Sequence, residues 1–425
     1  MIQYGESAEQ LRTGENIMKK TEGGVTAAKG FQAAGAEASI KYKNRKDMAM
    51  IYSEQPCVVA GTFTTNIVKA APVKWDQKVV KDSPFVQAVV VNAGIANACT
   101  RESGMEACRK TAEVAGKLLK IPAEAVLIGS TGIIGMQLPV DRIAAGVEKL
   151  VPLLCDTLEA GSLAAEAIMT TDTVRKEAAV QVELGGKTIT IGGMCKGSGM
   201  IHPNMCTMLA YVTTDAAISK ELLTKALKED VVDTFNMISV DGDTSTNDTL
   251  LVLANGMAQN EPITEEDADY QTFCEALHYI NETLAKKMAG DGEGATALFE
   301  TKVIHARTKQ DARVLAKSVI TSSLTKAAIF GHDANAMGRI LCALGYSGAE
   351  FDPEKMELYF MSEAGKMLIF KDGLVVDYSE EEATKILSAK EVTALVDMKM
   401  GEEEATAWGC DLTYDYVKIN ADYRS

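Results

Sequence analysis

The chain has 425 residues, 47% of them hydrophobic and 24% charged, which is enough for a large core and more than one layered domain. Asp and Glu total 59 against 43 Lys and Arg, and the formal net charge of -16 disfavours binding to nucleic acids or anionic membrane surfaces. No apolar run is long enough to span a bilayer, and we expect no secretory signal at the N-terminus.

Strand patterns and helix patterns alternate along the chain. In chain order they predict a strand at 85–91, a helix at 102–120, a strand at 125–129, a helix at 139–154, a hairpin at 178–184 and 188–191, a strand at 207–213, a helix at 220–235, a strand at 250–254 and a helix at 265–288. This order predicts an α/β or α+β fold with several sheets.

Two glycine-rich segments lack the spacing of nucleotide-binding motifs. Gly186-Lys187-Thr188 resembles the end of a P-loop, but Gln181 stands where that motif requires glycine. The segment 290–296 follows a predicted helix, whereas the dinucleotide motif follows a strand. Neither segment therefore predicts a nucleotide site.

The cysteines, histidines and clustered aspartates do not predict a metal site. Nine scattered cysteines without a Cys-x-x-Cys pair are typical of reduced thiols, which favours the cytoplasm, and the four histidines lack ligand spacing. Asp241, Asp243 and Asp248 lack the Glu that a calcium loop requires, so a structural turn is the better interpretation.

The most unusual segment covers residues 195–215. Small, turn-forming residues lead directly into the strand pattern that begins at Thr207. One interpretation is a plain loop entering a strand. In the other, the Thr207 hydroxyl attacks its own preceding carbonyl, and an acyl shift followed by hydrolysis cuts the chain after Cys206. The freed α-amine, with an ordinary pKa of about 7.7–8.0, then serves as the base for the hydroxyl.

Residues 196–215, with Asn-Met-Cys-Thr-Met-Leu at 204–209, resemble the self-processing site of the ornithine acetyltransferase (glutamate N-acetyltransferase) family of arginine biosynthesis. In that family the Thr of this motif, here Thr207, is both the cleavage point and the acetyl-carrying nucleophile. Further segments resemble family blocks in family order: 23–31, 60–66, 130–135, 167–173, 239–248, 290–296 and 416–425. The resemblance implies a self-processing α/β fold with layered sheets and helices, like that of N-terminal-nucleophile enzymes.

Two positions depart from the family pattern. Cys206 precedes the scissile bond where the family most often has Ala; a small side chain still permits cleavage, but a thiol can compete or be oxidised. Residues 92–97 read Asn-Ala-Gly-Ile-Ala-Asn where Asn-Ser-Gly-Asn-Ala-Asn is expected, which puts the local hydrogen bonding in question.

The resemblance implies acetyl transfer from N-acetylornithine to glutamate through an ester on Thr207. Each half of the reaction passes through a tetrahedral oxyanion, and the resemblance assigns Thr131 and Gly132 to the oxyanion hole. Ser130-Thr131-Gly132 follows the predicted strand, so from the residues alone an ordinary turn between a strand and a helix remains the alternative.

The family's substrate-contacting positions correspond to six residues of this chain: Thr170, Lys196, Thr207, Glu293, Asn420 and Ser425. Lys196 and Glu293 supply the cation and the anion that an amino-acid substrate needs, although each alone is typical of a solvated surface charge. A role for Ser425 requires that the C-terminal tail be held over the site. No cofactor is implied, and acetyl-CoA remains open as a second acetyl donor.

Cleavage would divide the chain into an α-chain, 1–206, and a β-chain, 207–425, which we expect to stay together as an α2β2 heterotetramer. Within the enzymes, the alternative is a related self-processing amidase or aminopeptidase, in which water replaces glutamate. From a different class, the alternative is an uncleaved amino-acid-binding protein that has kept the fold.

Overall fold

The computed structural model describes residues 3–4, 10–13, 16–41, 43–202 and 208–422. The chain forms two compact units, each described by itself below: the first comprises Met1–Gly197, Asn204–Val232 and Thr244–Leu284, and the second Ser198–Pro203, Asp233–Asp243 and Ala285–Ser425. These units do not coincide with the expected α- and β-chains. They do not test the cleavage, which remains a prediction. Within the described ranges, no helix is both long and apolar enough to cross a bilayer.

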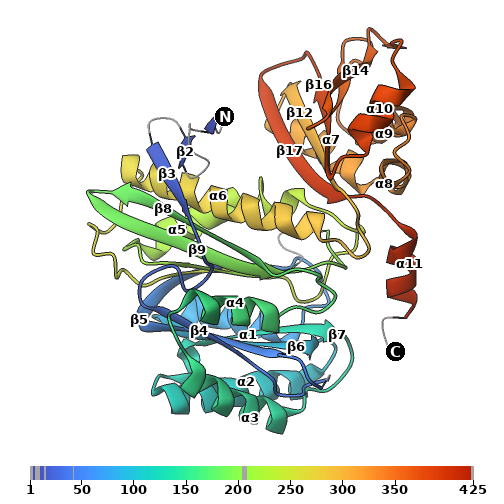
Figure 1. The fold of residues 1–425 in the computed structure, drawn as a ribbon. Coiled ribbons are helices and arrows are strands. Elements are labelled where there is room, and N and C mark those ends of the chain that lie inside the picture. Colours follow the sequence, from blue (N-terminus) through green and yellow to red (C-terminus); the bar gives the residue numbers. More distant parts are fainter. Residues whose placement is uncertain (1–2, 5–9, 14–15, 42, 203–207, 423–425) are drawn as a thin grey trace. The chain divides into compact units, whose positions relative to one another are not determined.

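The first unit is built on a large mixed sheet (Figure 1). Its strands pair in the order β1-β2-β3-β8-β9-β10-β11-β5-β6-β7, and β4 also pairs with β5. They are β1 (Gln3–Tyr4), β2 (Gln10–Thr13), β3 (Asn16–Thr21), β4 (Phe31–Ala36), β5 (Met48–Phe63), β6 (Val86–Ile95), β7 (Val126–Ile133), β8 (Lys176–Leu184), β9 (Lys187–Lys196), β10 (Leu209–Thr214) and β11 (Thr249–Ala254).

Strand β5 allows this sheet to form two layers because its two halves have different neighbours. The first half pairs with β4 and β6, whereas residues 58–63 pair with β11. The helices of this part of the chain are α1 (Ala71–Asp82), α2 (Arg101–Leu119), α3 (Val140–Leu150), α4 (Leu158–Ala167), α5 (Lys220–Asp230) and α6 (Ala268–Gly290), with short 3-10 turns η1 (Ala123–Ala125) and η2 (Val151–Leu153). Layered sheets and helices are the predicted fold class, which is confirmed.

Alternation along β6 and β7 divides the core into two clusters. Val89, Val91 and Leu127 face one cluster, which they share with Met194 of β9 and other residues of β10 and β11. The intervening residues face a second cluster that is closed by α2 and α3. Because side chains alternate along a strand, Thr131, four residues after Leu127, points to the same side of β7 as Leu127, which packs with Met194 of β9.

Most of the predicted elements are present, but two strands are longer than their apolar patterns. The hairpin across Gly185-Gly186 is formed by β8 and β9. The strands predicted at 85–91 and 125–129 continue to Ile95 and Ile133. Ser130-Thr131-Gly132 is therefore the end of a strand and not a turn that follows one. Polar and small residues occupy these strand ends, where β6 and β7 stay paired up to Ile95 and Ile133.

The second unit has its own sheet, in the order β15-β14-β13-β16-β12-β17, and α7 packs on β12 and β17. Its strands are β12 (Leu298–Ala306), β13 (Glu357–Ser362), β14 (Gly365–Lys371), β15 (Leu374–Val375), β16 (Glu391–Asp397) and β17 (Glu403–Cys410). Its further elements are η3 (Phe235–Met237), α7 (Lys309–Thr321), α8 (Ser323–Phe330), α9 (Ala336–Gly345), α10 (Glu380–Leu387) and α11 (Tyr414–Ala421).

Candidate active site

Strand β7, which carries Thr131 and Gly132, lies at the edge of its sheet, and helix α1 covers the first part of that edge. Trp75 Nε1 donates to Val126 O at 3.0 Å, and Ile128 N donates to the carboxylate of Asp76 at 2.8 Å. Backbone groups alternate along a strand, so the N–H of Gly132, four residues beyond Ile128, points to this same edge. The end of β7 therefore presents a backbone donor that the ladder does not use.

Gly132 has a backbone that only glycine adopts readily. Its φ is +125°, and a Cβ atom at this position would lie 2.3 Å from the backbone carbon of Gly94. Gly94, the register partner of Gly132 on β6, has a φ of +108°. The two strand ends thus approach each other closely without side chains, which fixes the direction of the Gly132 N–H.

A network of buried amide side chains holds the same strand ends. Ser130 Oγ donates to Asn92 Oδ1 at 2.7 Å. Asn247 Nδ2 donates to the carbonyl oxygens of both Ser130, at 2.8 Å, and Ala96, at 2.6 Å. Asn97 Nδ2 donates to a backbone carbonyl of α2. The departure from the family pattern at 92–97 therefore leaves Asn92 and Asn97 hydrogen-bonded.

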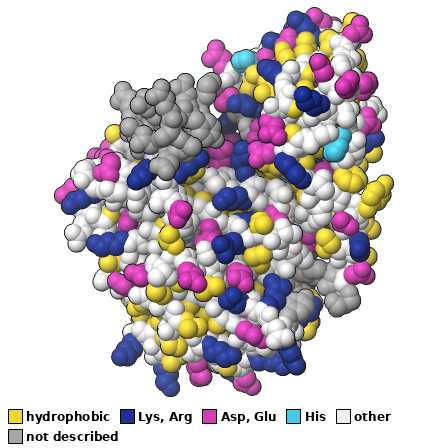
Figure 2. All heavy atoms as spheres, viewed as in Figure 1, with side chains coloured by type: hydrophobic (Ala, Val, Ile, Leu, Met, Phe, Trp, Pro, Cys, Tyr) yellow, Lys and Arg dark blue, Asp and Glu magenta, His cyan; other side chains and the backbone are white. Residues whose placement is uncertain are grey.

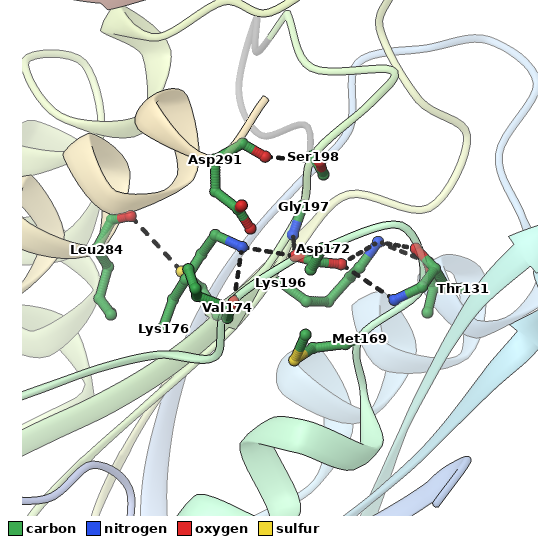
Figure 3. A network of polar contacts seen from close by, with 12 residues as sticks. Thr131, Met169, Asp172, Val174, Lys176, Lys196, Gly197, Ser198, Leu284 and Asp291 are labelled. Atoms are coloured by element: carbon green, nitrogen blue, oxygen red, sulfur yellow. Dashed lines mark hydrogen bonds and ion pairs between the residues drawn. The ribbon is translucent and has the colours of Figure 1, made fainter. Parts of the chain in front are cut away.

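A buried ionic cluster lies at the end of β9 (Figure 3). The Asp172 carboxylate is 2.8 Å from Lys176 Nζ and 3.6 Å from Lys196 Nζ, and the Asp172 and Lys176 side chains are fully buried. Asp172 also accepts from the backbone N–H groups of Thr170, at 3.0 Å, and Gly197, at 2.7 Å. One carboxylate therefore joins the segment after α4 to the end of β9.

The Asp172 carboxyl is ionised although it is buried. Burial opposes ionisation, but the ammonium groups of Lys196 and Lys176 and the donated hydrogen bonds hold its pKa well below the ordinary value. Because the carboxylate stays charged, it fixes both lysines close to it. Lys196 is thereby held by an ion pair and is not a solvated surface charge.

The ammonium group of Lys196 reaches two predicted site residues. Lys196 Nζ donates to Thr170 Oγ1 at 2.8 Å and to Thr131 Oγ1 at 3.4 Å (Figure 3). Strands β7 and β9 and the segment after α4 thus bring Thr131, Thr170 and Lys196 together. A cation beside two hydroxyls can bind a carboxylate or stabilise an oxyanion.

The predicted cleavage point, Cys206 and Thr207, lies outside the described residues. The strands on either side are described: Leu209 of β10 is the register partner of Lys196 on β9 and of Thr249 on β11. Met208 O accepts from Thr249 N at 2.8 Å. The first described residues after Thr207 thus enter the sheet next to the strand end that carries Lys196.

The second unit brings together two other predicted residues. Asn420 Nδ2 on α11 donates to Glu293 Oε2 at 2.6 Å, and Glu293 is buried. A Cβ atom on Gly199 would lie 2.4 Å from the Glu293 carboxyl carbon, so Gly199 packs closely against this carboxylate. Ser425 lies outside the described residues.

Sequence reasoning missed Asp172 and Asn247, which support the site. Both lie within segments that resemble family blocks, 167–173 and 239–248. Lys176, four residues after Asp172, was the available signal for an ion pair. For Asp241, the structure agrees with a turn: its carboxylate accepts from the backbone of Met200 and Ile201. Among the described residues, no group of His, Cys, Asp and Glu is arranged to hold a metal ion.

Comparison with known sequences assigns the family. The sequence model of the ArgJ family matches residues 32–425. The chain belongs to the ArgJ family. The arginine biosynthesis bifunctional protein ArgJ 1 of Clostridium acetobutylicum is 52% identical over 401 residues, which cover 94% of this chain and 97% of that protein. The corresponding protein of Bacillus subtilis is 46% identical over 415 residues, 98% of this chain and 100% of that protein.

A solved structure also matches the chain. It is the ornithine acetyltransferase of Mycobacterium tuberculosis complexed with ornithine, which is 41% identical and has a TM-score of 0.41. The match covers 44% of this chain and 98% of that chain. The ArgJ family assignment confirms the predicted resemblance to the ornithine acetyltransferase family, and an amidase or aminopeptidase is not favoured.

Proposed function

We propose that this ArgJ-family chain transfers the acetyl group of N-acetylornithine to glutamate through an ester on Thr207. Family membership over residues 32–425 is the observation that carries the proposal. The contact of Lys196 with the hydroxyls of Thr131 and Thr170 supports it, because acyl transfer needs donors for a developing oxyanion.

In the first half-reaction, the Thr207 hydroxyl attacks the acetyl carbonyl of N-acetylornithine. The Thr131 hydroxyl and the Gly132 N–H are the proposed donors to the oxyanion. The ester forms as the C–N bond breaks, and ornithine leaves with the hydroxyl proton. In the second half, the amine of glutamate attacks the ester, the ester C–O bond breaks, and the amine proton returns to the Thr207 oxygen. The ester keeps the acetyl group activated, so no ATP is needed.

Lys196 and Glu293 are the proposed charged contacts for the amino-acid substrates. The Lys196 ammonium attracts an α-carboxylate, and the Glu293 carboxylate attracts an ammonium group. Asp172 supports Lys196 at 3.6 Å, and Asn420 supports Glu293 at 2.6 Å. Thr170 and Ser425 complete the proposed set.

Thr207 becomes available through self-cleavage after Cys206, which yields the α-chain 1–206 and the β-chain 207–425. The proposed assembly is an α2β2 heterotetramer in the cytoplasm. Native mass spectrometry would test it: a single mass of two α- and two β-chains supports the proposal, and a monomer of the intact chain contradicts it.

The proposed second activity is acetylation of glutamate by acetyl-CoA. The curated relatives are named bifunctional, which supports a second reaction. Purified protein would be offered glutamate with N-acetylornithine and, separately, with acetyl-CoA. N-acetylglutamate from the first mixture tests the main proposal, and from the second mixture the additional one.

The covalent route is tested by exchange and by trapping. Labelled ornithine should enter N-acetylornithine without glutamate, and brief exposure to the donor should add one acetyl group to Thr207. Thr207→Ala should remain uncut and inactive, whereas Thr207→Ser keeps the hydroxyl and serves as the matched control. Strict dependence of exchange on glutamate would contradict the ester, and hydrolysis of the donor with glutamate present would indicate an amidase.

A further inference from the structure

An open cavity of about 400 Å³ in the first unit lies between the starts of α1 and α2. Part of its lining is apolar, including Ile67, Val68 and Met105, and the Ile67 side chain is almost fully exposed. An exposed apolar side chain at the mouth of a cavity marks a surface that a ligand can cover.

The charged lining of this cavity is mostly positive. Lys69, Lys74 and Arg101 line it, against one acid, Glu102. None of the three cations forms an ion pair or a side-chain hydrogen bond with the part of the chain that the structure describes. The chain as a whole has a net charge of -16, and both signs are mixed over the face seen in Figure 2, so the lining of this cavity differs in sign from the chain.

The segments that enter α1 and α2 meet at this cavity. Ala71 N, at the start of α1, donates to Asn97 O at 3.1 Å. Cys99 and Arg101, which line the cavity, have positive φ values of 59° and 51°. Left-handed residues in this number are costly and are concentrated at functional sites.

Hydrogen bonds connect the cavity wall to the strand that carries Thr131. Gly135 N donates to Ala98 O at 3.0 Å, directly before Cys99. Thr131 and Gly135 are four residues apart, which an extended chain spans in at most about 14 Å. On the opposite wall, Ala70 N donates to the carbonyl of Thr246, whose neighbour Asn247 holds the carbonyl of Ser130.

We propose that this cavity binds the phosphorylated nucleotide part of acetyl-CoA. Lys69, Lys74 and Arg101 would contact the phosphates, and the apolar lining would pack against the rest of the molecule. The inference rests on the proposed second activity. The thioester end then extends along the 132–135 segment toward Thr131 and Lys196 of the candidate site. There the Thr207 oxygen forms a bond to the acetyl carbon, the C–S bond breaks, and the hydroxyl proton passes to the thiol of the departing CoA.

Kinetics with the two donors test the assignment on the full-length enzyme. The double variant Lys69→Gln/Lys74→Gln removes two phosphate contacts without breaking any ion pair of the described structure. Its ratio of kcat/KM for acetyl-CoA to kcat/KM for N-acetylornithine should fall by about tenfold or more, the cost of a lost charge-assisted hydrogen bond. The matched control is Lys78→Gln/Lys81→Gln, which makes the same change in net charge elsewhere on α1 and should keep the ratio of the unmodified protein. Equal losses with both donors, or an unchanged ratio, would overturn the proposal.

Direct binding provides a test that does not depend on turnover. Cys99 lies at the cavity and Cys342, in the second unit, does not; both are exposed. Adenosine 3′,5′-bisphosphate, which has no thiol, should slow alkylation of Cys99 and leave Cys342 unaffected. Protection by this probe but not by inorganic phosphate identifies the nucleotide part, and equal protection by both indicates a simple anion site instead. If Cys99 is not protected, the site is wrong; if it is protected but acetyl-CoA is not a donor, only the proposed second activity has failed.

Discussion

Two buried aspartates of the first unit, Asp172 and Asp76, have pKa values that are shifted in opposite directions. Asp172 lies beside Lys176 and Lys196, and despite burial the two ammonium groups hold its pKa well below the ordinary value. Asp76 on α1 forms no ion pair with the described residues, and burial raises its pKa well above the ordinary value. One carboxylate oxygen of Asp76 accepts from Ile128 N, and the other has no partner among the described residues.

The neighbours of each aspartate explain the difference. Around Asp76 other pKa values are raised as well: burial and then the nearby Asp76 raise the pKa of the Tyr211 hydroxyl and of the Cys108 thiol. Around Asp172 the carboxylate holds Lys196 against the hydroxyls of Thr131 and Thr170. Burial alone therefore does not decide whether a carboxyl is charged. The charged region around Asp172 belongs to the candidate site, and the region around Asp76 covers the edge of β7.

Asp172→Asn should have the largest effect on stability. It leaves the buried Lys176 ammonium without its carboxylate, and breaking a buried ion pair costs about 3–5 kcal/mol. The folded-state pKa is lowered, so this contribution is complete above the ordinary pKa of about 3.9 and is lost as the pH falls through the folded-state value. Denaturant unfolding at pH 7 measures the stability lost in the variant, and at pH 3 the difference from the unmodified protein should be smaller.

The matched control is Glu166→Gln, which breaks the exposed Lys46–Glu166 pair. Such surface pairs are worth about 0–1 kcal/mol, so this variant should unfold almost like the unmodified protein. If Asp172→Asn costs no more than Glu166→Gln at pH 7, the two aspartates do not differ in the way the structure indicates.

Thr131→Ala tests whether the charged region serves catalysis. Loss of one oxyanion donor typically lowers kcat by about 10²–10³-fold, so kcat for N-acetylornithine should fall far more than KM rises. Thr131→Ser keeps the hydroxyl beside Lys196 and should retain most of the activity. An unchanged kcat in Thr131→Ala would remove this residue from the proposed mechanism.

Sequence reasoning predicted the helices and strands of the first unit well because their apolar periodicity is regular. It ended β6 and β7 too early, because Asn92 and Ser130 are polar residues that remain in the ladder by bonding to each other. Thr131, Thr170 and Lys196 were assigned by family resemblance. Asp172 was not, although Lys176 four residues later was an available signal; its second contact, with Lys196, joins separate segments and leaves no periodic signal in the sequence.

Asp76→Asn should become more stable relative to the unmodified protein as the pH rises, because burial raises the pKa of the Asp76 carboxyl. The raised folded-state pKa means that the contribution of this carboxyl to stability is present below the ordinary pKa and lost as the pH rises. The advantage of asparagine should therefore grow from pH 5 to pH 8, since its oxygen still accepts from Ile128 N. Asp82→Asn, at the exposed end of the same helix, is the control. If the stability of Asp76→Asn relative to the unmodified protein falls as the pH rises, the Asp76 carboxyl does not have a raised pKa.

Tyr211→Phe should have the smallest effect, a change within about 1 kcal/mol or a slight stabilisation. The Tyr211 hydroxyl is buried without a partner in the described part of the chain, and an unsatisfied buried polar group costs about 1–3 kcal/mol. It lies against β7, where a Cβ atom on Gly129 would be 2.0 Å from the hydroxyl oxygen, so removal of the oxygen leaves little space to fill.

Tyr211→Ala, which also removes the ring, should cost about 3–5 kcal/mol and shows that the position is sensitive to packing. Thermal and denaturant unfolding of both variants would separate the hydroxyl from the ring. A loss of 2 kcal/mol or more in Tyr211→Phe, on the order of a broken buried hydrogen bond, would mean that the hydroxyl has a strong acceptor. The Asp76 carboxyl is the nearby candidate, and the region around it would then be a polar network comparable to that of Asp172.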